Sequence, residues 1–157
     1  MKAASVNEIK QELKELNPAQ LSELCLRLAR FKKESKELLS FLLFEAGDTS
    51  LFSAKVKAEV DELFSLLKAE KNLYFTKKSL RKILRTVTKY SRYAASDELT
   101  AEWLLYFCTK LNDSGIPFRK SPVLVNMYQN QLKKINKLVE GMHEDMQGDY
   151  QKDLDQL

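Results

Sequence analysis

The sequence predicts an all-α protein, and three features support this fold class. Apolar residues recur every three or four positions through the 157-residue chain, and no stretch alternates strictly between apolar and polar residues over more than a few positions. Only four Gly and three Pro occur, whereas sheets and their turns need more of both. With 44% hydrophobic and 31% charged residues, the composition is that of a globular protein. We expect about seven helices, arranged as a compact bundle or as a short superhelix of helical hairpins.

The first two helices are expected over residues 5–16 and 17–31. In the second, Asn17 caps the helix, Pro18 takes the first helical position, where its missing N–H costs nothing, and Gln20 completes a capping box. Each helix has one apolar stripe, formed by Val6, Ile9, Leu13 and Leu16 in the first and by Leu21, Leu24, Cys25, Leu28 and Phe31 in the second.

The next two helices are expected over residues 33–46 and 49–68. The third helix is apolar over a wide arc, which predicts a central position in the fold, whereas the fourth has a single apolar face. The apolar residues are Leu38, Leu39, Phe41, Leu42 and Phe44 in the third helix, and Phe52, Val56, Val60, Leu63, Phe64 and Leu67 in the fourth.

The fifth helix, expected over residues 76–95, carries the most informative pattern of the chain. Residues 71–96 contain eight Lys and Arg and no Asp or Glu, whereas the rest of the chain has 18 Lys and Arg against 22 Asp and Glu. On a helix, seven of these cations fall within an arc of roughly 140°, opposite an apolar stripe. A field of one sign attracts an oppositely charged partner. We call these seven residues the basic face: Lys77, Lys78, Arg81, Lys82, Arg85, Lys89 and Arg92.

The last two helices are expected over residues 97–113 and 121–147, because Gly115 and Pro117 break the chain between them. Trp103 lies on a regular apolar stripe and is predicted to be a core residue. The two stripes consist of Trp103, Leu104, Phe107, Cys108 and Leu111, and of Leu124, Tyr128, Leu132, Ile135, Val139, Met142 and Met146.

Length and composition also predict the domain organisation and the compartment. We expect one all-helical domain over residues 1–148 and an acidic, frayed tail over residues 149–157. The N-terminus lacks the apolar core of a signal peptide, and the apolar patch 38–44 is far shorter than the ~20 residues that span a bilayer. Two cysteines are too few for a disulfide framework. The expected location is the cytoplasm, without membrane association.

No pattern predicts catalysis, a metal site or a cofactor. His143 is the sole histidine, so the unit Glu140-x-x-His143 lacks the second such unit that a di-iron bundle needs. Cys25 and Cys108 both lie on apolar stripes, where burial blunts thiol reactivity. The Asp61–Glu62 pair is expected on a solvated helix surface, and no Gly-rich phosphate loop or nucleophile elbow occurs. We therefore expect a protein that is not an enzyme.

The segment from Leu24 to Ala46, LCLRLARFKKESKELLSFLLFEA, resembles a family of short, uncharacterised, all-helical bacterial proteins. The resemblance covers about the first 65 residues. It implies an all-helical fold and a bacterial cytoplasmic protein, and it carries over no activity and no functional residues.

Several partners can neutralise the basic face. They are the acidic C-terminal segment of the same chain, a second subunit, another acidic protein, or nucleic acid, since the face spans about 22 Å and can follow several phosphates. Tyr74, Phe75 and Tyr93 lie beside it and can stack on unpaired bases. A membrane surface fits poorly, because the opposite apolar face has no Trp. Two further basic clusters consist of Arg27, Arg30, Lys32, Lys33 and Lys36, and of Arg119, Lys120, Lys133, Lys134 and Lys137.

We therefore predict a non-catalytic helical interaction module whose basic face docks an acidic surface. A low-specificity nucleic-acid-binding protein that uses the same residues is the alternative. The sequence does not predict the oligomeric state.

Overall fold

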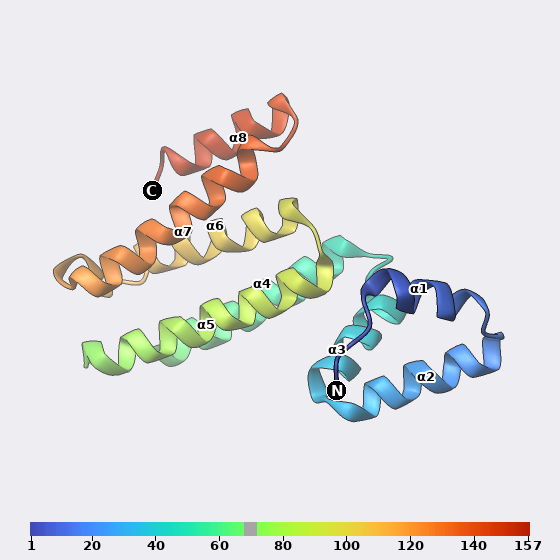
Figure 1. The fold of residues 1–157 in the computed structure, drawn as a ribbon. Helices are drawn as coiled ribbons and strands as arrows, with labels where there is room; N and C mark the ends of the chain where they lie inside the picture. The colour runs from blue at the N-terminus through green and yellow to red at the C-terminus, as the bar shows by residue number, and fades with distance from the viewer. Residues whose placement is uncertain (68–71) are drawn as a thin grey trace. The chain divides into compact units, whose positions relative to one another are not determined.

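The computed structural model describes residues 1–67 and 72–157 (Figure 1). No strand occurs in these two ranges, so the predicted all-α class is confirmed. The predicted limits at Lys68 and Lys71 fall outside the described residues. The helices are α1 (Val6–Lys14), α2 (Pro18–Phe31), α3 (Lys33–Ser40), the π-helix η1 (Phe41–Glu45), α4 (Thr49–Leu67), α5 (Leu73–Ala94), α6 (Asp97–Asp113), the 3₁₀ helix η2 (Phe118–Lys120), α7 (Pro122–Glu140) and α8 (Glu144–Leu154).

The chain divides into two compact units, Met1–Glu45 and Ala46–Leu157. In the first unit, the capping box of α2 forms as predicted: Asn17 Oδ1 accepts from the Gln20 N–H at 2.9 Å, and Gln20 Oε1 accepts from the Asn17 N–H at 3.0 Å.

The apolar stripes of the first unit remain largely exposed. Phe41 alone is buried among residues 1–45, all of which are described, and Phe44 is 81% exposed. The prediction that the third helix is central is therefore wrong, and so is the prediction that Cys25 is a core residue, because its side chain is exposed. A unit of this size cannot enclose all of its apolar surface.

In the second unit, α4 to α7 run alternately up and down, so α4 is parallel to α6 and α5 is parallel to α7 (Figure 1). α6 packs against α4, α5 and α7 and is the central helix. Trp103 is 1% exposed, which confirms its predicted place in the core. The other core residues of α6 are Thr100, Ala101, Leu104, Phe107, Cys108 and Leu111.

The helix predicted over residues 121–147 is interrupted. α7 ends before Gly141, a residue of low helix propensity, and His143 then caps α8 by accepting a hydrogen bond from the Asp145 N–H. The described residues therefore form eight α-helices, and α8 includes residues 149–154 of the segment predicted to be a frayed tail.

Candidate functional site

All seven residues of the basic face lie on α5, the helix predicted to carry them. Asn72 caps the start of this helix by accepting from the Tyr74 N–H at 2.9 Å, and Ala95 ends it in the left-handed conformation. Leu80, Ile83 and Val87 are fully buried on the inner side. On the outer side Lys77 and Lys89 are half-buried, and the exposed members of the face are Lys78, Arg81, Lys82, Arg85 and Arg92.

Most of this charge has no partner within the described chain. Lys89 lies over the ring of Tyr90, with its Nζ 4.6 Å from the ring centroid. The other six cations form no ion pair and no side-chain hydrogen bond with any described residue. Because a guanidinium or ammonium group binds carboxylates and phosphates through several N–H donors, these side chains are available to an external anion.

The acidic C-terminal segment lies elsewhere in the same unit. α8 packs against α7, and Tyr150 Oη donates to the carbonyl oxygen of Glu98 on α6 at 3.2 Å. Asn112 Nδ2 donates to the carbonyl oxygen of Leu157 at 2.9 Å. Burial, together with Glu102, Glu98 and Asp153, raises the pKa of Tyr150 to about 12. Within the described residues the carboxylates of α8 therefore do not neutralise the basic face.

An open groove of about 720 Å³ lies between α5 and α7. Its α5 wall carries three cations of the basic face, so the structure divides that face into a part inside the groove and a part outside it. We call this site the basic groove. It is lined from α5 by Lys78, Arg81, Leu84, Arg85 and Thr88, and from α7 by Val123, Asn126, Met127, Asn130 and Gln131.

The aromatic residues near the basic face differ in exposure. Tyr93 is buried, so its predicted place at the edge of the face is wrong. Tyr74 and Phe75 are 66% and 49% exposed and pack edge to face at the start of α5. None of these three residues lines the basic groove.

The other basic clusters contribute differently. Arg119 is held by Asn112 Oδ1, which accepts from its guanidinium at 2.9 Å, and it stacks 5.1 Å above the Phe118 ring. Lys133, Lys134 and Lys137 are exposed on α7, further along the chain than the groove-lining residues of that helix. The third cluster belongs to the N-terminal unit.

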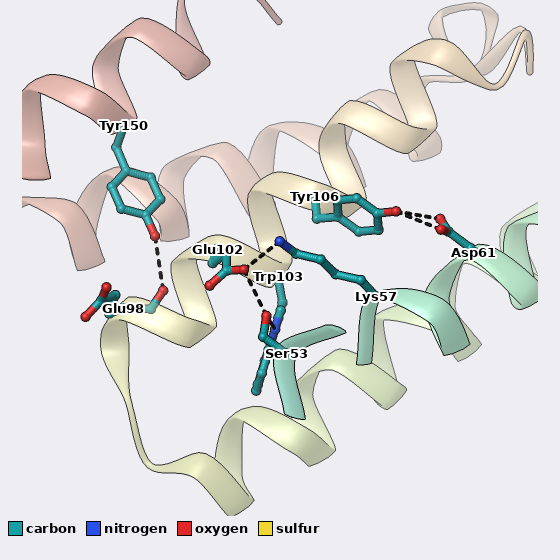
Figure 2. Close-up of polar contacts among 8 residues, drawn as sticks. All are labelled: Ser53, Lys57, Asp61, Glu98, Glu102, Trp103, Tyr106 and Tyr150. Atoms are coloured by element: carbon teal, nitrogen blue, oxygen red, sulfur yellow. Dashed lines mark hydrogen bonds and ion pairs between the residues drawn. The ribbon is translucent and has the colours of Figure 1, made fainter. Parts of the chain in front are cut away.

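A polar ladder joins the parallel helices α4 and α6 (Figure 2). At one end, Trp103 Nε1 donates to Ser53 Oγ at 2.8 Å, Ser53 Oγ donates to Glu102 at 2.8 Å, and Lys57 pairs with Glu102 at 2.6 Å. At the other end, Tyr106 Oη donates to the Asp61 carboxylate at 2.7 Å, and Lys110 pairs with Asp61 at 2.7 Å. The ladder consists of Ser53, Lys57 and Asp61 on α4 and of Glu102, Trp103, Tyr106 and Lys110 on α6.

Asp61, which the sequence predicts on a solvated helix surface, is 45% exposed, and its carboxylate is also a member of this ladder. Partial burial alone raises the pKa of Asp61, but the hydrogen bonds from Lys110 and Tyr106 and the charge of Lys110 outweigh it, so the pKa lies below its usual value. Apart from Trp103, the ladder residues of each helix are four positions apart, which is visible in the sequence, although the pairing of the two helices is not.

The described residues contain no group of three or more His, Cys, Asp or Glu residues that could hold a metal ion. Burial raises the pKa of the Cys108 thiol to about 12, so its reactive thiolate form is scarce at neutral pH. Along the described ranges, no helix combines the length and apolarity needed to cross a membrane.

Comparisons with known proteins give no match: no protein-family model, no curated protein and no solved structure is significantly similar to this chain.

Proposed function

We propose that this protein is a non-catalytic interaction module that docks an acidic protein surface on the basic face of α5. The observation that carries the proposal is the contrast between this face and the rest of the second unit. Lys57 and Lys110 of the polar ladder each pair with a carboxylate, whereas six cations of the basic face pair with no described residue.

The distribution of carboxylates supports this proposal. Glu102 on α6 is paired with Lys57, and Glu59 on α4 accepts a hydrogen bond from Tyr90 Oη. Both groups therefore serve contacts between helices, and neither forms an ion pair with the exposed cations of α5. Unscreened charges of one sign speed association with an oppositely charged surface and orient it.

Low-specificity binding of nucleic acid is the second candidate function. It is favoured by the exposed rings of Tyr74 and Phe75 at the start of the basic face, because aromatic rings can stack on unpaired bases. The burial of Tyr93 removes one of the three aromatic residues on which this candidate depended.

The two candidates differ in their ligands and in their dependence on salt. We would measure the fluorescence anisotropy of a labelled amphipathic peptide rich in Glu, and of labelled RNA, single-stranded DNA and duplex DNA. Each would be titrated with the full chain at low salt and at about 0.15 M salt, where phosphate-dominated binding falls steeply. The matched variant reverses Arg81, Arg85 and Lys89 to Glu.

Peptide binding that persists at the higher salt and is lost in the charge-reversal variant would support the proposal. Nucleic-acid binding that persists at the higher salt, without binding of the peptide, would replace it with the second candidate. Failure of all four ligands to bind would overturn both.

A further inference from the structure

We infer that the basic groove between α5 and α7 is the binding site for one amphipathic helix of an acidic partner protein. This inference rests on the proposed function and adds where and how the partner binds. It assigns the contact to Lys78, Arg81 and Arg85 rather than to the whole basic face, and to uncharged residues of α7 that face them across the groove.

The dimensions of the groove fit a short helix. Its lining runs from Lys78 to Thr88 on α5, which is about 15 Å, or three helical turns, at 1.5 Å per residue. α5 and α7 run in the same direction and both begin at the same end of the unit (Figure 1). A helix laid between two parallel helices extends the packing that the unit already uses, and binding of amphipathic helices in grooves is a recurring mode of recognition.

The lining combines charge with apolar anchor points. Leu84 and Met127 are half-buried and Val123 is exposed, so apolar side chains of a ligand can bury surface against them. The unbranched side chain of Met127 can adapt to the shape of a ligand. Arg81 and Arg85 can then bind carboxylates on the flanks of the same helix, with bidentate geometry.

The polar groups of the groove are nearly all unpaired among the described residues. Gln131 donates its amide to the Met127 carbonyl oxygen at 3.1 Å. Neither the cations nor Thr88, Asn126 and Asn130 make a side-chain hydrogen bond to any described residue. The amides of Asn126 and Asn130 can donate and accept, which suits the mixed polar groups of a peptide.

The same lining argues against nucleic acid as the occupant. Single-stranded nucleic acids are held by aromatic stacking and by cations that follow the phosphates. No aromatic residue lines this groove, and along the groove the cations stand on the α5 wall only. An acidic amphipathic helix needs no stacking ring and places its carboxylates on one flank.

The test compares two variants with equal change in charge. Arg81→Glu/Arg85→Glu reverses two cations inside the groove, and Lys82→Glu/Arg92→Glu reverses two exposed cations of α5 outside it. The probe is a labelled peptide of about 14 residues with Glu on one helical face and Leu on the other, long enough to cover the groove. A peptide of the same composition in scrambled order, and single-stranded oligo(dT), serve as controls.

We expect the groove variant to weaken binding of the amphipathic peptide by more than about tenfold at 0.15 M salt, and the outer variant by less than about threefold. Met127→Ala should weaken binding of the same peptide by about threefold to tenfold, without changing the charge of the protein. The scrambled peptide should bind at least tenfold more weakly than the amphipathic one.

Three outcomes of these binding measurements would contradict the inference, each in a different way. Equal loss in both double variants, with Met127→Ala unchanged, would overturn the groove and leave docking on the whole basic face. No binding of either peptide to the unchanged protein would overturn the proposed function as well. Tighter binding of oligo(dT) than of the peptide, lost equally in both double variants, would assign the face to nucleic acid.

Discussion

The second unit contains two pairs of parallel helices whose facing surfaces differ. Between α4 and α6, the charged residues of the polar ladder are paired with one another and with Tyr106 and Ser53, and Trp103 donates to Ser53. Between α5 and α7, the three cations of the basic groove pair with no described residue. The two regions differ in net charge as well as in pairing. The ladder contains two cations and two carboxylates, whereas the groove is lined by three cations and no carboxylate. We propose that the paired region stabilises the fold and that the unpaired region binds a partner.

The buried ring of Trp103 should contribute most to the stability of the ladder region. Trp103→Ala is therefore expected to have the largest effect on the free energy of unfolding. Removing this fully buried side chain leaves a cavity and deprives Ser53 Oγ of its donor, so the free energy of unfolding should fall by about 3–5 kcal/mol. Urea denaturation followed by far-UV circular dichroism measures this change. A loss below about 1 kcal/mol would mean that the ring is not a core group.

Reversal of two charges should lower the free energy of unfolding clearly in the ladder and hardly at all in the groove. Lys57→Glu/Lys110→Glu places new carboxylates beside Glu102 and Asp61, and we expect it to lower the free energy of unfolding by about 2 kcal/mol. Arg81→Glu/Arg85→Glu carries the same change in net charge and should alter it by less than about 0.5 kcal/mol.

Both double variants would be compared with the unchanged protein in parallel urea titrations. Equal destabilisation in the two would show that the cations of the groove have a structural role, and would remove the contrast on which the proposed function depends.

Two tyrosine hydroxyls allow a finer comparison. Tyr106 Oη donates to the carboxylate of Asp61, whereas the buried hydroxyl of Tyr128 on α7 has no partner in the described chain. We expect Tyr106→Phe to lower the free energy of unfolding by about 1 kcal/mol, and Tyr128→Phe to leave it unchanged or raise it slightly. Thermal denaturation of the two variants measures the difference, and the reverse order would contradict the assignment of partners.

The smallest expected effect is a dependence on pH. The pKa of Asp61 is lower in the folded protein than in the unfolded chain, so its stabilising contribution is present above about pH 4 and is lost as the pH falls through the folded-state pKa. Because this side chain is 45% exposed, the contribution should stay below about 1 kcal/mol. The stability gap between the unchanged protein and Asp61→Asn should therefore narrow from pH 6 to pH 3, and a constant gap would contradict this account.

The sequence predicts the second unit better than the first. The stripe of α6 is buried where the periodicity of three and four places it, and so are Leu80, Ile83 and Val87 on α5. The same periodicity fails for Leu28 and Phe31 of α2, which are exposed, because periodicity shows which residues can be buried and not whether another helix covers them. The helix break at Gly141 was missed because the apolar register continues through Met142 and Met146.

The candidate site is predictable in one half only. The cations of α5 all have the same sign and lie on one face of one helix, so their spacing in the sequence is enough to predict that face. The groove also needs Asn126, Met127 and Asn130, whose side chains are uncharged and form no recognisable motif. They become part of a site only because α7 lies parallel to α5, and that arrangement depends on the packing of both helices on α6.

The most direct test maps the binding site residue by residue. Amide chemical shifts of the ¹⁵N-labelled full chain would be followed by NMR during titration with the acidic amphipathic peptide. The account predicts that the largest changes fall on residues 78–88 of α5 and 123–131 of α7, while the amides of the polar ladder change little. Changes centred on α4 and α6, or no saturable changes on α5, would contradict it.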